Sequence, residues 1–307
     1  MQKKREPIQS SQRKLFSKKR IRIISIVILI FIISGVMLSK FFFQPAEPAF
    51  SLKAAIVDQL ASEIPNSKLN ETGAVANMLK SVGFTVYYYK SEAINVAFYR
   101  ELAKNNYGII VLRVHSAMRI GEALVDFFTT ERFNADKYGS ELDDGLLTKG
   151  YYSWKPDEYY FAITPKFIEN LEGTFPKSII IAMGCNSLNE TATKMAEAFK
   201  KKGAVAYVGW TGLVDSSHTD EATLRLLQSF VLENRTLDES TRIEPDPIYR
   251  SRMNYYPPGA GNLTIFDLVK EANTSKTSQI AVNNFEQGSF PIYVINITRL
   301  RLKELQI

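Results

Sequence analysis

Runs of apolar residues recur along the chain and predict the strands of a buried sheet. Five such runs lie at 53–58, 84–89, 108–114, 178–183 and 204–208. They are continuous rather than alternating, which is typical of parallel strands that are covered on both faces. Apolar residues at helical spacing predict intervening helices at 70–81, 95–105, 190–202 and 220–234. This alternation predicts an α/β fold with a doubly wound, mostly parallel sheet.

One interval interrupts the alternation. Residues 116–177 are rich in tyrosine and acidic residues and contain one short helical pattern, at 165–171. Loops of this length without secondary structure are uncommon unless they have a function. We therefore interpret 116–177 as an insertion into the α/β domain and expect it to be functional.

The last part of the chain gives weaker signals. A helix is expected near 263–272 and a final strand at 290–295, which would complete the sheet or cover its edge. These patterns divide the globular part of the chain into an α/β domain at 53–237 and a C-terminal extension at 238–307 that packs on it.

A longer apolar run precedes the domain. Residues 23–38 are almost wholly apolar, and the flanking Arg22 and Lys40 can extend their charged ends toward the membrane surfaces. The segment 23–43 is therefore long enough to cross a hydrocarbon core, which requires about 20 residues. Basic residues before it predict that the amino terminus stays in the cytoplasm and that the domain emerges on the other side.

This interpretation gives a basic cytoplasmic tail at 1–22, a single transmembrane helix at 23–43 and a spacer at 44–52. A cleaved signal peptide, cut near 45–49, is the alternative. The hydrophobic region of such peptides usually spans about 7–15 residues, so the longer run here favours an uncleaved anchor.

The net charge has a different meaning once the tail is separated. The 307-residue chain carries +6, and residues 1–22 contain nine basic residues and one acidic residue, which leaves −2 for the remainder. The basic character therefore belongs to the tail, where it fits the anchor's orientation. A nucleic-acid-binding surface on the domain is not expected.

Two further features agree with an extracytoplasmic domain. The chain has one cysteine, Cys185, so no intrachain disulfide can form. Asn-X-Ser/Thr acceptor sequences for glycosylation follow the anchor at six positions: Asn70, Asn189, Asn234, Asn262, Asn273 and Asn296.

The rarest reactive side chains follow the predicted strands. His115 and Ser116 come directly after the strand at 108–114, and Cys185 follows the strand at 178–183. The second histidine, His218, lies shortly after the strand at 204–208. Because ligands bind beyond the carboxyl ends of parallel strands, we expect these side chains to meet at one edge of the sheet.

A cysteine and a histidine in this position suit nucleophilic catalysis. A thiol becomes a good nucleophile when a base such as imidazole removes its proton. Cys185 is expected at a strand-to-helix turn, where free backbone N–H groups can stabilise a thiolate or the oxyanion of a tetrahedral intermediate. Gly184 would allow the tight turn before it.

The segments VLRVHSA and IIIAMGCNS resemble the caspase-haemoglobinase fold, in the gingipain, CHAT and separase branch of cysteine peptidases. KKGAVAYVGWTGLVD is similar to the strand that follows the nucleophile in that group, and the resemblance covers Ala54 to Leu232. It implies His115 as general base, Cys185 as nucleophile, a polypeptide substrate and no cofactor.

The resemblance also assigns supporting roles. The N–H groups of Ser116 and Cys185 would form the oxyanion hole, although the family usually has glycine where this chain has Ser116. Trp210 would line the cleft in which an extended peptide pairs. Independently of the resemblance, Arg113 needs a partner because it is a charge near the end of a buried strand. A structural pair with Asp58 or Glu131 is the default, and the functional alternative places its charge near Cys185 or an acidic substrate group.

Other interpretations stay open. A catalytically inactive domain of this fold would act as a surface module that binds a protein partner. Cys185, His115, His218 and Asp215 would also form a plausible tetrahedral metal site. However, we expect His218 to lie at the start of a helix that is capped by Ser216 or Ser217. For Asp215 we expect a capping or turn role.

Overall fold

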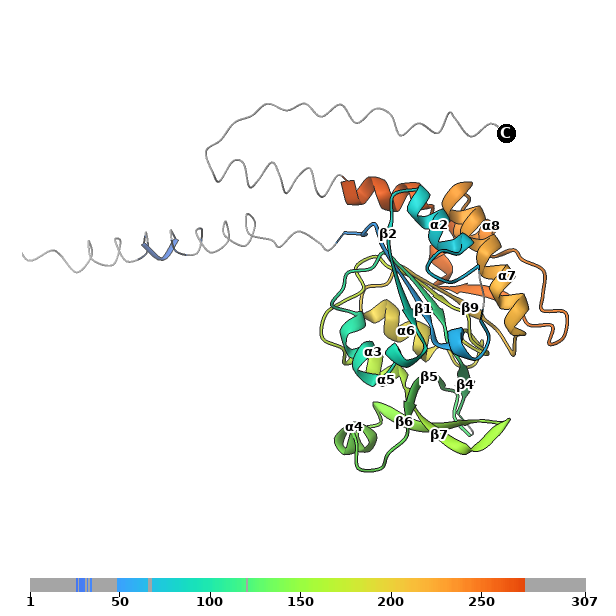
Figure 1. Ribbon diagram of the computed structural model, residues 1–307. Coiled ribbons are helices and arrows are strands. Elements are labelled where there is room, and N and C mark those ends of the chain that lie inside the picture. The colour runs from blue at the N-terminus through green and yellow to red at the C-terminus, as the bar shows by residue number, and fades with distance from the viewer. Residues whose placement is uncertain are drawn as a thin grey trace, which may run out of the picture. The chain divides into compact units, whose positions relative to one another are not determined.

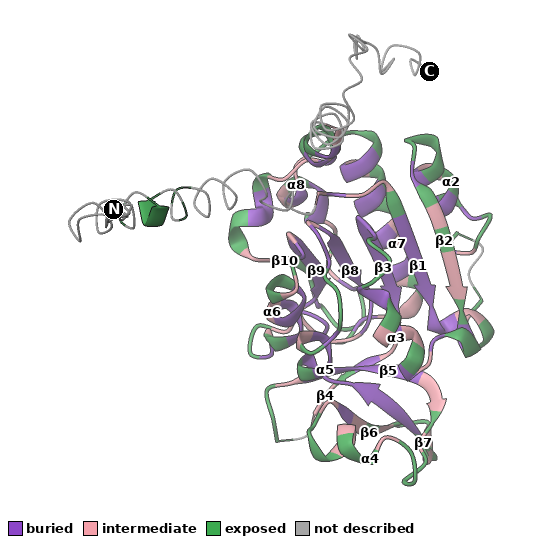
Figure 2. Ribbon diagram, turned by 90° about the vertical axis from the view of Figure 1, so that its left-hand side faces the viewer, coloured by how far each residue is buried: buried purple, intermediate pink, exposed green. Residues whose placement is uncertain are grey.

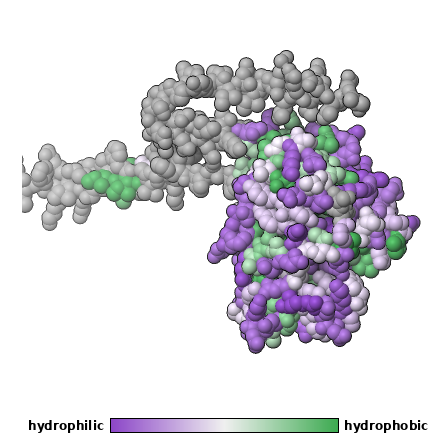
Figure 3. All heavy atoms as spheres, viewed as in Figure 1, coloured by the Kyte–Doolittle hydropathy of each residue, from purple (hydrophilic) through white to green (hydrophobic). Residues whose placement is uncertain are grey.

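The computed structural model describes residues 26, 28–30, 32, 34, 49–65, 68–119 and 121–273. It separates into two units, Met1–Glu47 and Pro48–Ile307. The described residues of the first unit are helical, and all but Ser34 are isoleucine or leucine with more than half of their surface exposed (Figure 3). No helix within the described residues is long and apolar enough to span a membrane. Most of the anchor predicted at 23–43 lies outside them.

The larger unit contains a six-stranded sheet in the order β10-β9-β8-β3-β1-β2 (Figure 1). Its parallel strands are β1 (Lys53–Asp58), β2 (Thr85–Lys90), β3 (Ile109–Arg113), β8 (Ile179–Ala182) and β9 (Ala206–Trp210). Each corresponds to one of the five predicted runs, so the α/β architecture with a mostly parallel sheet is confirmed. Figure 2 shows that the central strands are buried, as their unbroken apolar composition requires.

Helices cover both faces of this sheet (Figure 1). One face packs against α2 (Ala74–Ser81), α7 (Ser216–Leu227) and α8 (Leu237–Thr241), and the other against α3 (Val96–Leu102), α5 (Pro165–Glu169) and α6 (Lys194–Lys201). Shorter helical segments are η1 (Gln59–Ser62), η2 (Ser91–Ala93), α4 (Gly139–Asp143), η3 (Gln228–Leu232) and η4 (Pro258–Asn262). Residues 265–273 are also helical, close to the range predicted for that helix.

The predicted insertion is a second sheet and not a long loop. It contains β4 (Ser116–Met118), β5 (Val125–Arg132), β6 (Leu147–Tyr152) and β7 (Lys155–Ile163), which form an antiparallel sheet in the order β4-β5-β7-β6. This sheet lies beyond the carboxyl ends of the parallel strands (Figure 1). Its aromatic residues extend the core, because Phe127 and Phe161 are fully buried.

The C-terminal extension contributes a strand that the sequence patterns did not predict. β10 (Met253–Tyr256) pairs antiparallel with β9 and forms one edge of the main sheet. The strand predicted at 290–295 lies outside the described residues.

Candidate active site

The carboxyl ends of three neighbouring strands, β1, β3 and β8, define the candidate site. η1 and Glu63 follow β1, His115 follows β3, and Gly184-Cys185 follow β8. The order β8-β3-β1 puts these three segments side by side. The sheet therefore brings the two residues predicted to be catalytic to adjacent strand ends.

His115 is held by a carboxylate and by two aromatic rings. Its Nε2 lies 3.3 Å from Glu63 Oε2, and 21% of its side chain is exposed. The imidazole centroid lies 4.6 Å from the Tyr152 ring and 5.3 Å from the Trp154 ring. These contacts come from the residue that follows η1 and from the β6–β7 hairpin, so the second sheet forms one wall of the site.

The surroundings set the protonation of this pair. Burial lowers the pKa of His115 below its ordinary value, and the hydrogen bond and charge of Glu63 offset that effect only in part. Burial alone would raise the pKa of Glu63, but the hydrogen bonds and charges of His115, Trp154 and Lys155 bring it below its usual range. Near neutral pH the imidazole is therefore neutral. If it donates from Nε2 to Glu63, its lone pair is on Nδ1.

Gln59 fixes the backbone beside the imidazole. Its Oε1 accepts the His115 N–H at 2.7 Å, and its Nε2 donates to Tyr152 Oη at 3.0 Å and to Thr129 O at 3.2 Å. This amide is almost completely buried and joins the main sheet to the second sheet. Our sequence interpretation missed both Gln59 and Glu63. The available signal was their position directly after a buried strand, at the edge where His115 was expected.

Cys185 is half-buried and its thiol has a backbone partner. Sγ lies 3.7 Å from the Val214 carbonyl oxygen in the loop after β9. Burial raises the pKa of the Cys185 thiol, and the negative charge of Asp246 raises it further. The thiol is therefore protonated near neutral pH, and a base is needed to generate the thiolate.

The loop that carries Val214 is fixed by the C-terminal extension. Asp246, which is fully buried, accepts the Asp215 N–H at 2.8 Å. Ser251 Oγ donates to Leu213 O at 2.5 Å. Both neighbours of Val214 are thus held by residues beyond 237.

A direct bond joins the histidine loop to the cysteine loop. Ser116 Oγ donates to the Cys185 carbonyl oxygen at 2.6 Å. Gly184 makes this approach possible, since a Cβ at that position would overlap Ser116 Oγ and the Val114 carbonyl oxygen. Glycine is required at position 184 because the two strand ends are so close, and Ser116 supplies the connecting hydroxyl.

The backbone N–H groups of Ser116 and Cys185 lie on the two segments that the Ser116–Cys185 bond joins. Phe128 N donates to His115 O, so Ser116 and Phe127 form a non-hydrogen-bonded pair and the Ser116 N–H points away from β5. Among the described residues, the Cys185 N–H donates to no backbone carbonyl in a loop or turn, and it interacts with its own sulfur, which partly offsets the raised pKa of the thiol. These are the two groups that the family resemblance assigns to an oxyanion hole.

The imidazole and the thiol are not hydrogen-bonded to each other within the described residues. Each has another partner, Glu63 for His115 and the Val214 carbonyl for Cys185. The link between their loops is the Ser116 bond to the Cys185 backbone.

The roles predicted for Arg113 and Trp210 need correction. Arg113 is completely buried and donates to both carboxylate oxygens of Asp220, at 2.7 and 2.8 Å, and to Asp58 at 2.8 Å. The pair with Asp58 is thus confirmed, Glu131 is not a partner, and no surface remains for a substrate. Trp210 is also fully buried, and its Nε1 donates to Thr219 Oγ1 at 2.8 Å, so it does not line an open cleft.

The residues considered for a metal site have separate roles. Asp215 caps α7 by accepting the N–H groups of Ser217 and His218, so the capping role expected for Asp215 is confirmed and the cap is not Ser216 or Ser217. His218 Nε2 lies 3.2 Å from Glu244 O. No group of three potential ligands able to hold a metal ion occurs among the described residues.

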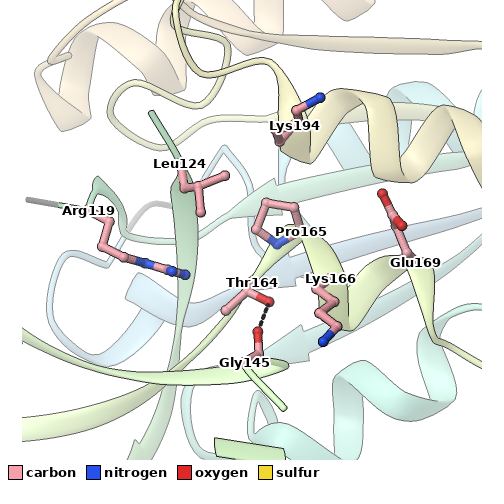
Figure 4. A pocket seen from close by; sticks show the side chains of 8 residues that line it. All are labelled: Arg119, Leu124, Gly145, Thr164, Pro165, Lys166, Glu169 and Lys194. Carbon is pink, nitrogen blue, oxygen red and sulfur yellow. Dashed lines mark hydrogen bonds between the residues drawn. The ribbon is translucent and has the colours of Figure 1, made fainter. Parts of the chain in front are cut away.

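A cavity of about 330 Å³ lies between α5 and the second sheet (Figure 4). Its four charged lining residues already have partners: Arg119 pairs with Asp126, Lys166 donates to the Asp144 carbonyl oxygen, Lys194 pairs with Glu197, and Glu169 pairs with Lys201. The one bond between lining residues drawn there is Thr164 Oγ1 to Gly145 O, which is structural. This cavity therefore offers little reactive chemistry compared with the strand ends.

No protein-family model matches the chain, and no curated protein is significantly similar to it in sequence.

Proposed function

We propose that the domain is a cysteine endopeptidase of the caspase-haemoglobinase type that cleaves polypeptides on the outer side of a membrane. The observation that carries this proposal is the Ser116 Oγ bond to the Cys185 carbonyl, which joins the loops of the candidate base and nucleophile at adjacent strand ends. Glu63 adds a carboxylate that orients the imidazole.

The proposed reaction begins with both groups neutral. Cys185 Sγ leaves the Val214 carbonyl and attacks the substrate carbonyl carbon while His115 Nδ1 takes the thiol proton. The Ser116 and Cys185 N–H groups stabilise the oxyanion. His115 then returns the proton to the departing amine, and water hydrolyses the thioester. Glu63 stabilises the positive imidazole between these steps.

The first experiment measures the rate at which iodoacetamide alkylates Cys185, the only cysteine in the chain. At pH 7.5, replacing His115 with alanine should slow alkylation by about tenfold or more. General-base assistance typically accelerates enzymatic reactions by about 10²–10⁴-fold, so tenfold is the smallest effect consistent with that role. His218→Ala is the matched control and should leave the rate unchanged. Equal rates for wild type and His115→Ala would overturn the peptidase proposal.

Membrane attachment is part of the same proposal. It is supported by the basic tail, the apolar run at 23–43, and the exposed isoleucine and leucine residues of the described helical positions. The full chain should remain in the membrane fraction after alkaline carbonate washing, and protease added to intact cells should remove the domain. Release by carbonate would contradict the anchor.

Binding of a surface protein without catalysis is the second candidate. One observation favours it: the thiol is held by the Val214 carbonyl, and its pKa is raised. If a cellular phenotype of the gene deletion is fully restored by Cys185→Ala, binding is the function. Restoration only by wild type supports the peptidase.

A further inference from the structure

Trp154 lies at the turn between β6 and β7, beside the candidate base. Its ring centroid lies 5.3 Å from that of His115, and its Nε1 donates to Glu63 Oε1 at 3.3 Å. Even so, 56% of Trp154 is exposed. A large aromatic side chain this accessible, beside a functional group, calls for an explanation beyond core packing.

A column of stacked rings supports Trp154. Its ring is nearly parallel to Tyr152, at an interplanar angle of 9° and a centroid distance of 5.0 Å. Tyr152 in turn stacks on Phe128 at 4.9 Å. Tyr152 and Phe128 are buried, so the column is anchored in the second sheet. One face of Trp154 is therefore covered by Tyr152, and its exposed surface is available for a flat group to stack on.

Local charge indicates which group would fit. Glu63 is the carboxylate next to Trp154, and it is already shared by His115, Trp154 and Lys155. Lys155 Nζ, 3.4 Å from Glu63, balances its charge and would repel a cationic side chain. The surroundings are thus close to neutral, which favours an uncharged planar side chain over arginine, lysine or aspartate.

The exposed tyrosines of the same hairpin provide a contrast. Tyr151 and Tyr159 are 49% and 38% exposed and contact each other at 5.8 Å. Tyr152 packs against Phe128, Trp154 and His115, whereas Tyr151 packs against Tyr159, so the two neighbouring rings have different partners. Tyr151 therefore serves as a matched control.

We propose that Trp154 forms the wall of a substrate subsite that accepts an aromatic side chain next to the scissile bond. This inference rests on the proposed peptidase function and adds the substrate class. Trp154 determines specificity and is not itself a catalytic residue.

The test uses hexapeptides of alanine and glycine with one central Phe, Arg, Asp or Ala, and wild-type protein in detergent. We expect Phe to be preferred over Ala in kcat/KM, and Trp154→Leu to lower that preference by about two- to tenfold, the range expected for one aromatic contact. Trp154→Phe should keep most of it, and Tyr151→Leu should leave it unchanged. Tyr151→Leu should retain the wild-type alkylation rate of Cys185. For the Trp154 variants, the ratio of kcat/KM for the Phe and Ala peptides cancels any change in the common rate that follows from loss of the Trp154 bond to Glu63. Cleavage that favours Arg or Asp, or a Phe preference unaffected by Trp154→Leu, overturns the subsite while the peptidase proposal stands.

A binding measurement separates the two proposals if no peptide is cleaved. The chain has two tryptophans, and Trp210 is fully buried, so Trp154 dominates the solvent-sensitive fluorescence. In Cys185→Ala, the Phe peptide should protect Trp154 from acrylamide quenching, and the Asp and Arg peptides should not. Protection without cleavage supports the subsite and contradicts the peptidase. Absence of both contradicts the two proposals together.

Discussion

Two groups of charged side chains lie at the same edge of the parallel sheet and differ in burial. The inner cluster, Arg113, Asp58 and Asp220, is almost completely buried. The outer cluster, His115, Glu63 and Lys155, has side chains that are 21%, 34% and 40% exposed. Both combine carboxylates with nitrogen donors, but only the outer cluster can be reached by a substrate. Position at a strand end therefore does not identify a functional residue without knowledge of its burial.

The largest loss of stability is expected when the inner cluster is broken. Arg113→Met leaves two carboxylates buried without their cation, and the free energy of unfolding should fall by about 3–5 kcal/mol. Urea denaturation of the chain in detergent measures this change. Arg225→Met, which removes an exposed pair with Glu221, is the control and should cost less than about 1 kcal/mol. A similar, small effect of both substitutions would show that the inner cluster is not a structural network.

Gln59 lies between the clusters and should give an intermediate effect. Gln59→Leu leaves the His115 N–H without its acceptor and removes the donor to Tyr152 and Thr129. Unfolding free energy should fall by about 1–3 kcal/mol, the usual cost of an unsatisfied buried polar group. Alkylation of Cys185 should also slow, because the imidazole loses its support. A stability loss with an unchanged alkylation rate would limit Gln59 to a structural role.

Glu63→Gln should change the pH dependence of Cys185 alkylation more than it changes the free energy of unfolding. Glu63 raises the pKa of His115 against the lowering effect of burial. Without the carboxylate that pKa falls further, so the acidic limb of the alkylation profile should move to lower pH. The shift should be less than about one pH unit, since a pair this exposed is screened by solvent. A shift to higher pH would contradict the assignment of His115 as the base.

The smallest effect is expected for Lys155→Met. Its bond to Glu63 is long and exposed, so unfolding free energy should change by less than about 0.5 kcal/mol. Cleavage of an Arg peptide relative to a Phe peptide should nevertheless increase, because the repelling cation is removed. An unchanged ratio would show that Lys155 does not influence substrate charge.

The same contrast explains what the sequence could predict. The strands of the main sheet are unbroken apolar runs, and residues 53–58 match β1 as observed. β6 and β7 combine tyrosines with charged residues, and their pairing depends on the neighbouring strand and not on local pattern. For that reason the strands of the second sheet were not predicted, and 116–177 was interpreted as an insertion with one short helix.

The candidate site was predictable in part. Rare residues after apolar strands identified His115 and Cys185, because strand ends meet at one edge. Their partners were not predictable, since Glu63 and Trp154 are 91 residues apart in sequence and meet only through the second sheet. Trp210 was misassigned because a strand-end position does not reveal that α7 covers its ring.

The clamp that Asp246 and Ser251 place on the loop of Val214 has a practical consequence. The boundary between domain and extension at residue 237 does not mark a point where the chain can be cut. A protein ending there would lose β10 and both anchors of the carbonyl that restrains the thiol. The smallest fragment worth expressing therefore runs to residue 273, and the surroundings of Cys185 depend on residues beyond 237.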